Sequence, residues 1–500
     1  MTPGRPWCDQ ARASGRDAAL LALVVALPLA AALFGARGGR PLTLNFGPGD
    51  SPYVSGFAPQ YEIDDKVGTH WTTYHAAVDL PLAVDAADAQ LVLRFVRVFP
   101  QTAVTDVSLG GRPVDRFESR GGLFQERRAA LGPLRGAPLA FRMDADSHER
   151  QDRGLKLDWL RVEMPAGGVV RLRGGARWTP AAVVLVAAVL LILGGWPAGR
   201  AAALLAPLAI LLAAGLLTDP WFTHRLLRGV PASLVLFGGV GILIARWQLA
   251  RGRALAASIR VLTVLALLAF LLRAAAMNHP DFYYPDQRTH ARLVEKVREK
   301  GVAFFVSPSS AIAEHGVWRT EAYGRTYAFP YSPAFHLPFA PLALPYDTLL
   351  LAMKLAAAAV SVVPLVLVWA LARRLGASTA GAFLMVVIPT YTSRLSFAFL
   401  PSLFGHAVDM AFLLWLAARL DRPGPPVAGG DPGAGLTERR TWLAGAAWVA
   451  ARSKASARWA LRGLSPGVAG FSRAAISSTS FSVYFSRDNF GSSYSRMPTS

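Results

Sequence analysis

The sequence predicts a polytopic, mostly α-helical membrane protein that carries one β-sandwich domain near its N-terminus. Of its 500 residues 53% are apolar and only 17% are charged, and the apolar residues gather in uncharged stretches. Stretches of about 17–25 such residues are long enough to cross a bilayer. Residues 37–176, in contrast, are polar, rich in turn-forming residues and alternate apolar with polar positions. A single water-soluble globule is excluded, and so is a disulfide-stapled scaffold, because the chain has one cysteine.

The positive charge of the chain follows the membrane segments. Lys and Arg outnumber Asp and Glu by 52 to 32, and Arg residues flank the apolar stretches, as in cytoplasmic loops under the positive-inside rule. No basic stripe with interleaved aromatics is present, so we expect membrane lipid, and no nucleic acid, as the partner of this charge. Arg225, Arg228 and Arg273 fall at outer ends of expected spans, against that bias. Lys354 lies several residues inside a span, from which it can snorkel outward.

The pattern divides the chain into an N-terminal anchor, a sandwich and two groups of membrane spans around a long loop. The first apolar run exceeds a signal-peptide core of about 7–15 residues, so we expect a retained anchor rather than a cleaved signal peptide. Counting from a cytoplasmic N-terminus in the cytoplasmic (inner) membrane places the sandwich and the loop outside the cytoplasm. The expected segments are 1–36 (N-terminus and anchor), 37–176 (sandwich), 177–275 (four spans), 276–347 (outer loop), 348–422 (further spans) and 423–500 (tail). The expected spans are Ala18–Ala36, Pro180–Trp196, Ala201–Leu217, Ala232–Trp247, Ile259–Ala275, Leu349–Ala372, Thr379–Tyr391 and Phe404–Ala418.

The tail differs in composition from the rest of the chain. It begins with a Pro/Gly linker at Pro423–Gly435 and becomes Ser-rich and basic from Arg452 onward, without periodicity. An apolar run at Thr441–Ala451 is too short to cross a bilayer. Two interpretations stay open, a disordered tail or a sequence out of frame from near Ala450, and both leave the expected membrane domain incomplete at its C-terminal end.

The sandwich prediction depends on alternating side chains and turn signals. Residues 139–144 and 155–159 each alternate apolar with polar or small residues, which is the period of a strand with one buried face. In the second stretch we expect the apolar side chains to face the core, and Lys156 and Asp158 to face water. The Gly-Gly pair at 110–111 predicts a hairpin turn between two short strands. Several short strands separated by Gly and Pro indicate a β-sandwich.

Short motifs along this segment also resemble a known class of domain. They are, in order, Leu44-Asn45-Phe46-Gly47, Gly56-Phe57, Trp71-Thr72, Gly110-Gly111-Arg112-Pro113-Val114 and Asp152-Arg153-Gly154-Leu155. This order resembles jelly-roll domains similar to carbohydrate-binding modules. The resemblance implies an accessory domain that recognises glycan.

The outer loop carries the candidate chemistry. Asp281 and Asp286 stand just beyond an expected span and are separated by Tyr283 and Tyr284. Apolar residues at 293, 294 and 297 follow with helical spacing, so a helix is predicted to begin near Asp286. Two roles for Asp286 stay open: a cap that satisfies free backbone N–H groups of this helix, and a base that accepts the proton of an attacking hydroxyl.

Two motifs of this loop resemble a family of membrane transferases. Pro285-Asp286-Gln287-Arg288-Thr289-His290-Ala291 follows an outward-running span, and Tyr331-Ser332-Pro333-Ala334-Phe335-His336-Leu337 leads into the next one. Over residues 259–422 their order and spacing are similar to the first outer loop of GT-C glycosyltransferases, which include the protein O-mannosyltransferases and the aminoarabinose-lipid transferases.

The resemblance implies a GT-C-like helical bundle that transfers a sugar, with inversion, from a polyprenyl-phosphate donor to an envelope glycan, lipid or protein acceptor at the outer face of the membrane. It makes Asp286 the catalytic carboxylate. The family's second acidic position is Gln287 in this chain, so Asp281 is expected to substitute for it. Cations would stabilise the charge that develops on the leaving phosphate. The residues expected to bind substrate are Arg288, His290, Tyr283, Tyr284, His336 and Arg394.

Two alternatives stay open, one about a cofactor and one about whether the protein is an enzyme. No tight metal-ligand spacing is present and no metal ligand is assigned, but some GT-C enzymes use a divalent cation, so such a cation stays open. A non-enzymatic carrier or scaffold with a glycan-recognising outer domain is the alternative to an enzyme. A carrier is expected to show inverted repeats, broken helices and polar residues at mid-membrane. Polar and aromatic residues concentrate instead at Asn278–Tyr331, which favours the transferase.

Overall fold

The computed structural model describes residues 6–46, 53–64, 67–96, 102–146, 154–251, 256–279, 285–301, 320–322, 325–327, 333–374 and 407–416. The chain divides into two compact units, Met1–Leu414 and Trp415–Ser500. The first unit contains the sandwich and the six long apolar helices found among the described residues.

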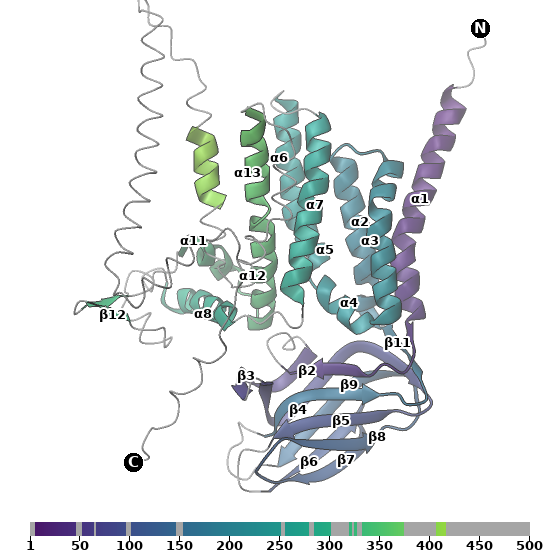
Figure 1. The fold of residues 1–500 in the computed structure, drawn as a ribbon, viewed down its shortest axis with the longest axis vertical. Coiled ribbons are helices and arrows are strands. Elements are labelled where there is room, and N and C mark those ends of the chain that lie inside the picture. The colour runs from purple at the N-terminus through teal and green to yellow at the C-terminus, as the bar shows by residue number, and fades with distance from the viewer. Residues whose placement is uncertain are drawn as a thin grey trace, which may run out of the picture. The chain divides into compact units, whose positions relative to one another are not determined.

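Eleven of the described strands form one antiparallel sheet, which folds into the predicted sandwich (Figure 1). The main path runs in the order β7-β6-β9-β4-β10-β5-β8; β3 and β11 pair with β4, β1 with β11, and β2 with β10. The strands are β1 (Ala36–Arg37), β2 (Leu42–Asn45), β3 (Val54–Asp64), β4 (Val67–Ala86), β5 (Gln90–Val96), β6 (Ala103–Leu109), β7 (Arg112–Ser119), β8 (Gln125–Ala130), β9 (Leu134–Asp146), β10 (Lys156–Glu163) and β11 (Gly168–Leu172).

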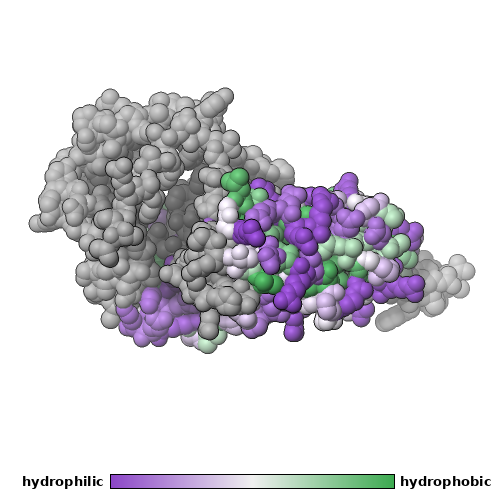
Figure 2. All heavy atoms as spheres, turned by 90° about the horizontal axis from the view of Figure 1, so that it is seen from below, coloured by the Kyte–Doolittle hydropathy of each residue, from purple (hydrophilic) through white to green (hydrophobic). Residues whose placement is uncertain are grey.

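The long strand β4 joins the two layers of the sandwich. Near its start it pairs with β10 through His70 and Trp71, and further along it pairs with β9 from His75 to Ala86. The apolar faces of both layers meet in one core, where the side chain of Phe141 is 1% exposed. The coloured part of Figure 2, the view from below, shows many polar side chains on this face with apolar ones between them. The alternation predicted for residues 139–144 is therefore confirmed, with one face buried and the other in water.

The predicted hairpin is also confirmed. β6 and β7 pair with each other and are joined by Gly110 and Gly111, whose φ angles are +57° and +85°. A tight hairpin turn of this kind requires positive φ at both central residues, a conformation that costs glycine little.

The alternation predicted for residues 155–159 is confirmed for its two leucines, which are buried, and wrong for the other three residues. Lys156 and Asp158 are each 3% exposed, whereas Trp159, which was expected in the core, is half-buried on the outer side. The β10–β5 pairing shifts register between Leu157 and Trp159, and such a bulge moves the following side chains to the opposite face. An ion pair of 3.0 Å with Arg94 accompanies the buried Asp158 carboxylate, and burial still raises its pKa.

Six helical stretches of the described residues are long and apolar enough to cross a membrane. They overlap the first six expected spans, while the expected span at 379–391 lies outside the described residues and a shorter apolar helix occupies Ala407–Leu416. The stretches are Gly15–Phe34, Gly174–Leu193, Ala198–Thr218, Pro220–Ala250, Ala257–Asn278 and Thr348–Ala370. The helices are α1 (Pro6–Phe34), α2 (Thr179–Leu193), α3 (Ala198–Thr218), α4 (Pro220–Leu227), α5 (Val230–Ser233), α6 (Gly239–Ala250), α7 (Ala256–Asn278), α8 (Pro285–Lys300), α11 (Pro333–His336), α12 (Tyr346–Val360) and α13 (Val363–Arg374).

The sandwich packs directly on the helices. Its core continues onto Ala31 and Ala32 of α1, Leu216 near the end of α3 and Trp221 of α4. The side-chain amide of Asn278, the last residue of α7, bonds backbone carbonyls at the end of α4. The sandwich and the start of the long loop therefore lie at the same end of the helices.

Candidate functional site

The short helix α4 organises the contact between sandwich and membrane helices. It begins at a clear start signal, because Asp219 accepts a hydrogen bond from the backbone N–H of Phe222 at 2.8 Å and Pro220 occupies the first helical position. Its buried side chains include Trp221 and Arg225. A helix of this length that carries an indole and a guanidinium inward is built for contact rather than for spanning lipid.

Tyr53 of the sandwich packs against α4. Its ring meets the ring of Trp221 edge-on, with centroids 4.6 Å apart, and lies 6.4 Å from the ring of His224. The Arg228 guanidinium lies 5.4 Å from the centre of the Tyr53 ring, and the Arg225 guanidinium lies 5.4 Å from the centre of Trp221. Cations over aromatic faces are attracted by the ring quadrupole, so the two arginines are held beside the sandwich.

A third cation lies close to these arginines. Lys354 of α12 lies within electrostatic range of both Arg225 and Arg228. The side chain of its neighbour Leu355 lies against Gly229, the residue after Arg228. We call these three side chains the cationic junction. Like charges at short range repel one another, and ionisable groups at membrane depth are costly, so such a grouping is characteristic of a functional site.

Asn278 connects the cationic junction to the carboxylate-bearing loop. Its side-chain amide donates to the backbone oxygens of Leu226 and Arg228, at 3.1 and 3.0 Å. The neighbouring ring of His279 meets that of Phe222 edge-on at 5.3 Å. The segment that leads to Asp281 thus departs from the same place that holds the two arginines.

The structure brings together two predicted site residues, His290 and His336. Nδ1 of His290, on α8, lies 3.0 Å from Nε2 of His336, on α11. The two rings are 1% and 0% exposed, and Phe335 packs edge-on against His290. At the far end of α8, Arg298 donates to three backbone carbonyls of residues 339–344. The pair is a buried link between α8 and the segment that begins at α11, and their expected role in substrate binding stays a prediction.

The other predicted site residues are only partly described. The backbones of Asp286 and Arg288 lie in α8, which begins at Pro285 and so confirms the predicted helix start; their side chains lie outside the described part. Four further predicted site residues, Asp281, Tyr283, Tyr284 and Arg394, lie wholly outside the described residues. Within the described residues, no group of three or more His, Cys, Asp or Glu side chains is arranged to hold a metal ion.

Sequence reasoning missed the importance of α4 and Tyr53. In the sequence Arg225 and Arg228 stand out only as exceptions to a charge bias, although the start signal at Asp219-Pro220 is visible there. An aromatic residue and two arginines within one short helix and its end could have marked a packed element. No sequence signal pairs them with Tyr53, because that contact is long-range.

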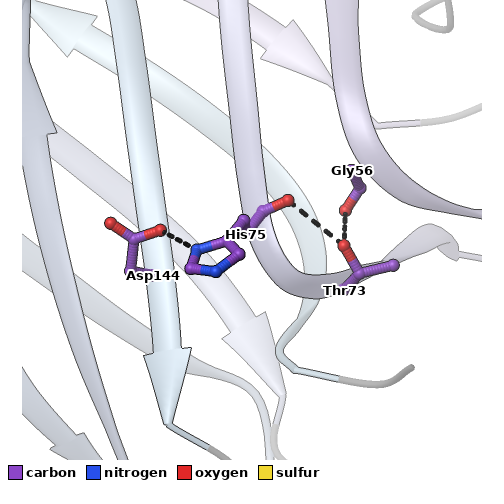
Figure 3. A network of polar contacts seen from close by, with 4 residues as sticks. All are labelled: Gly56, Thr73, His75 and Asp144. Atoms are coloured by element: carbon purple, nitrogen blue, oxygen red, sulfur yellow. Dashed lines mark hydrogen bonds and ion pairs between the residues drawn. The ribbon is translucent and has the colours of Figure 1, made fainter. Parts of the chain in front are cut away.

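A second polar network lies on the outside of the sandwich (Figure 3). His75 Nδ1 lies 2.6 Å from an oxygen of Asp144, and the hydroxyl of Thr73 donates to the backbone oxygen of Gly56 at 2.7 Å. The side chains of His75 and Asp144 are 75% and 51% exposed. Gly56 has a φ of +68°, and an added Cβ would stand 1.7 Å from the His75 carbonyl oxygen. The network ties β3, β4 and β9 together, and its exposure marks it as a strand contact.

Comparisons with known proteins concern the fold of the sandwich. No protein-family model matches the chain, and no curated protein matches it significantly. Among solved structures it is similar to the C-terminal CBM6 of LamC, a laminarinase of Zobellia galactanivorans, at 10% identity over 25% of this chain and 99% of that one, with a TM-score of 0.19. A family 35 carbohydrate-binding module from Clostridium thermocellum matches at 14% identity over 25% and 97% of the two chains, with a TM-score of 0.19. A module from Cellvibrio mixtus lichenase 5A, solved with cellotriose, matches at 10% identity over 24% and 95%, also with a TM-score of 0.19.

Proposed function

We propose that the chain is a membrane glycosyltransferase that transfers a sugar from a polyprenyl-phosphate donor to an acceptor at the outer face of the cytoplasmic membrane. In this reaction an acceptor hydroxyl oxygen bonds the anomeric carbon while the bond from that carbon to the phosphate oxygen breaks. The hydroxyl proton passes to a carboxylate, for which Asp286 is the first candidate and Asp281 the second. The polyprenyl phosphate leaves with the bonding electrons.

The observation that carries this proposal is the link through Asn278. Asn278 stands three residues before Asp281 and holds the carbonyls of Leu226 and Arg228. Three residues span at most about 10 Å, so the length of chain after Asn278 is short enough for Asp281 to act beside the cationic junction. Carboxylate and cations are the two groups this transfer needs: one takes a proton, and the others stabilise the charge on the leaving phosphate.

The packing of α8 supports the same assignment for Asp286. This residue stands four positions before His290, and His290 is fixed by its bond to His336. α8 also buries Val294 in the apolar cluster that includes Met353 of α12, the residue next to Lys354. A catalytic group must be held in productive geometry by the residues around it. The backbone of α8 is held both by the histidine pair and by the apolar cluster with α12.

The experiment uses the full chain in proteoliposomes, supplied with a panel of polyprenyl-phosphate donors that each carry one labelled sugar and with a cell-envelope extract as acceptor. We expect Asp286→Asn to lower transfer by about 10²–10⁴-fold, the usual contribution of a positioned base. Glu299→Gln, on the exposed side of the same helix, is the matched control and is expected to leave transfer unchanged.

The cations are tested in the same assay. Arg228→Gln is expected to lower kcat/KM by about 10–150-fold if the guanidinium contacts the donor phosphate, since a charge-assisted hydrogen bond contributes about 1.5–3 kcal/mol. Arg177→Gln, at an exposed arginine stacked on Trp178, is the control. Full transfer by Asp286→Asn, or no turnover of any donor by the unmodified chain, would overturn the proposal in favour of a non-enzymatic carrier or scaffold.

A further inference from the structure

We propose that a cleft at the seam between the sandwich and α4 binds a neutral saccharide unit, at a site separate from the candidate carboxylates. We call it the seam cleft. It has a volume of about 330 Å³. This lies at the lower end of the range of about 300–1,000 Å³ found for small-molecule sites, so it suits one or two sugar rings rather than a long chain. It is lined by Tyr53, Asp79, Pro81, Arg173, Gly174, Gly175, Ala176 and His224.

Two of the residues that line the seam cleft carry a buried polar group that lacks a hydrogen-bond partner. The hydroxyl of Tyr53 and Nδ1 of His224 form no hydrogen bond, and the two residues are only 7% and 8% exposed. Buried polar groups are almost always hydrogen-bonded, so two orphaned ones lining the same cleft indicate a ligand that supplies the missing partners. The edge-on contact of Tyr53 with Trp221 holds the phenol in place for such a ligand.

The rim of the seam cleft carries one acid and one base. Asp79 on β4 and Arg173 after β11 are both exposed, and the backbone N–H of Arg173 donates to the carbonyl of Pro81. Gly174 and Gly175 follow, and no atom lies within 4 Å of where a Cβ would stand at either position. The rim is therefore open at the two glycines and charged at Asp79 and Arg173.

This lining selects for hydroxyl groups. A carboxylate accepts only, a guanidinium donates only, and a phenol and a neutral imidazole do both, so the set matches hydroxyls that donate and accept at once. Burial raises the pKa of Tyr53, which keeps its hydroxyl protonated and able to donate. An anion such as phosphate would meet Arg173 but be repelled by Asp79. An apolar chain would leave the Tyr53 hydroxyl and His224 Nδ1 without partners.

The Tyr53 ring already packs against two side chains. Arg228 lies 5.4 Å from the ring centre, and Trp221 packs edge-on with it. The saccharide is therefore held through hydrogen bonds at the phenol oxygen rather than by stacking. Arg228 also belongs to the cationic junction. A sugar in the seam cleft would therefore contact Tyr53, the residue whose ring lies beside the Arg228 guanidinium.

The test measures binding, so it is independent of the transferase assay. The full chain in nanodiscs is titrated with a panel of mono- and disaccharides by calorimetry and by tryptophan fluorescence, to which Trp221 beside Tyr53 contributes. Separate arms use inorganic phosphate and nanodiscs doped with a lipid-linked saccharide. If the lipid-linked saccharide competes with the free saccharide, the natural ligand is a lipid-borne sugar. If the free saccharide binds and the lipid-linked one does not compete, the ligand is a free glycan. Both outcomes support a saccharide site.

Two variants localise the binding. Gly175→Leu adds a bulky side chain to the lining of the seam cleft, at a backbone conformation that tolerates one, and is expected to abolish saccharide binding. Tyr53→Phe is expected to weaken binding about three- to tenfold, the ratio given by the loss of one neutral hydrogen bond. Tyr74→Phe, on β4 beside His75 and away from the cleft, is the matched control and should bind like the unmodified chain. Binding of phosphate alone, binding of no saccharide, or saccharide binding that survives Gly175→Leu would overturn the proposal. Because transfer is not measured, failure of the saccharide site and failure of the proposed transferase are distinguished by separate measurements.

Discussion

Asn278→Ala is expected to loosen the end of α7 from α4 without unfolding either helix. The side-chain amide of Asn278 makes two hydrogen bonds, 3.1 Å to the carbonyl of Leu226 and 3.0 Å to that of Arg228. Each neutral hydrogen bond contributes about 0.5–1.5 kcal/mol net, so losing both costs about 1–3 kcal/mol. That free energy raises the population of an open α4–α7 contact by about 5- to 150-fold.

Amide hydrogen exchange in nanodiscs measures this opening directly. The peptide that covers α4 and the turn after it should lose protection by the same ratio, while peptides from β5 and β8 of the sandwich stay unchanged. Asn45→Ala, at an exposed residue of β2, is the matched control. Thermal unfolding of the whole chain should shift little, because the sandwich core does not include Asn278. Unchanged protection of α4 in Asn278→Ala would refute the role assigned to this link.

Two further predictions concern the sandwich and the histidine pair. Arg127 bonds the Asp115 carboxylate and lowers its pKa, so this carboxylate stabilises the fold above the unfolded value of about 3.9 and loses that effect as pH falls through the lowered pKa. Asp115→Asn should therefore unfold at a lower temperature than the unmodified chain at neutral pH, with the difference closing in acid; a difference that is constant with pH would contradict this. His290→Phe and His336→Phe should each destabilise the chain by about 1–3 kcal/mol, because each leaves a buried ring nitrogen without its partner. The double variant should cost less than the sum in chemical denaturation, and strict additivity would show that the pair is not coupled.

Local patterns in the sequence predicted the elements but not their long-range partners. Hydropathy placed the apolar helices, and the Gly-Gly pair at 110–111 placed a hairpin, since both signals are local in sequence. The strand β10 was mispredicted at Asp158 and Trp159, because the bulge that changes their faces depends on pairing with β5. Lys156 lies before the bulge and is buried with its ammonium 5.4 Å from the centre of the Trp71 ring, a contact with β4. Alternation assumes an unbroken ladder, and a bulge breaks it without leaving a mark in the residues themselves.

The candidate site shows the same limit. The sequence marks His290 and His336 separately as substrate contacts, yet they lie 46 residues apart in sequence and bond each other in the interior. The start of α8 near Asp286 was predicted correctly from apolar spacing, a local property. The grouping of Arg225, Arg228 and Lys354 depends on how the turn after α4 packs on α12, which tertiary packing decides and no short motif encodes.

The sandwich gives a physical reason why two arginines depart from the positive-inside rule. In the proposed topology Arg225 and Arg228 lie on the outer side, where the positive-inside rule disfavours arginine. Their guanidinium groups lie over the rings of Trp221 and Tyr53, and Tyr53 belongs to the sandwich. A cation–π contact contributes about 0.5–2 kcal/mol, more where water is excluded, so the sandwich provides part of the environment that holds these cations at the outer end. The sandwich is then a structural part of the cationic junction as well as an accessory domain, and a change that displaces Tyr53 should alter the position of Arg228.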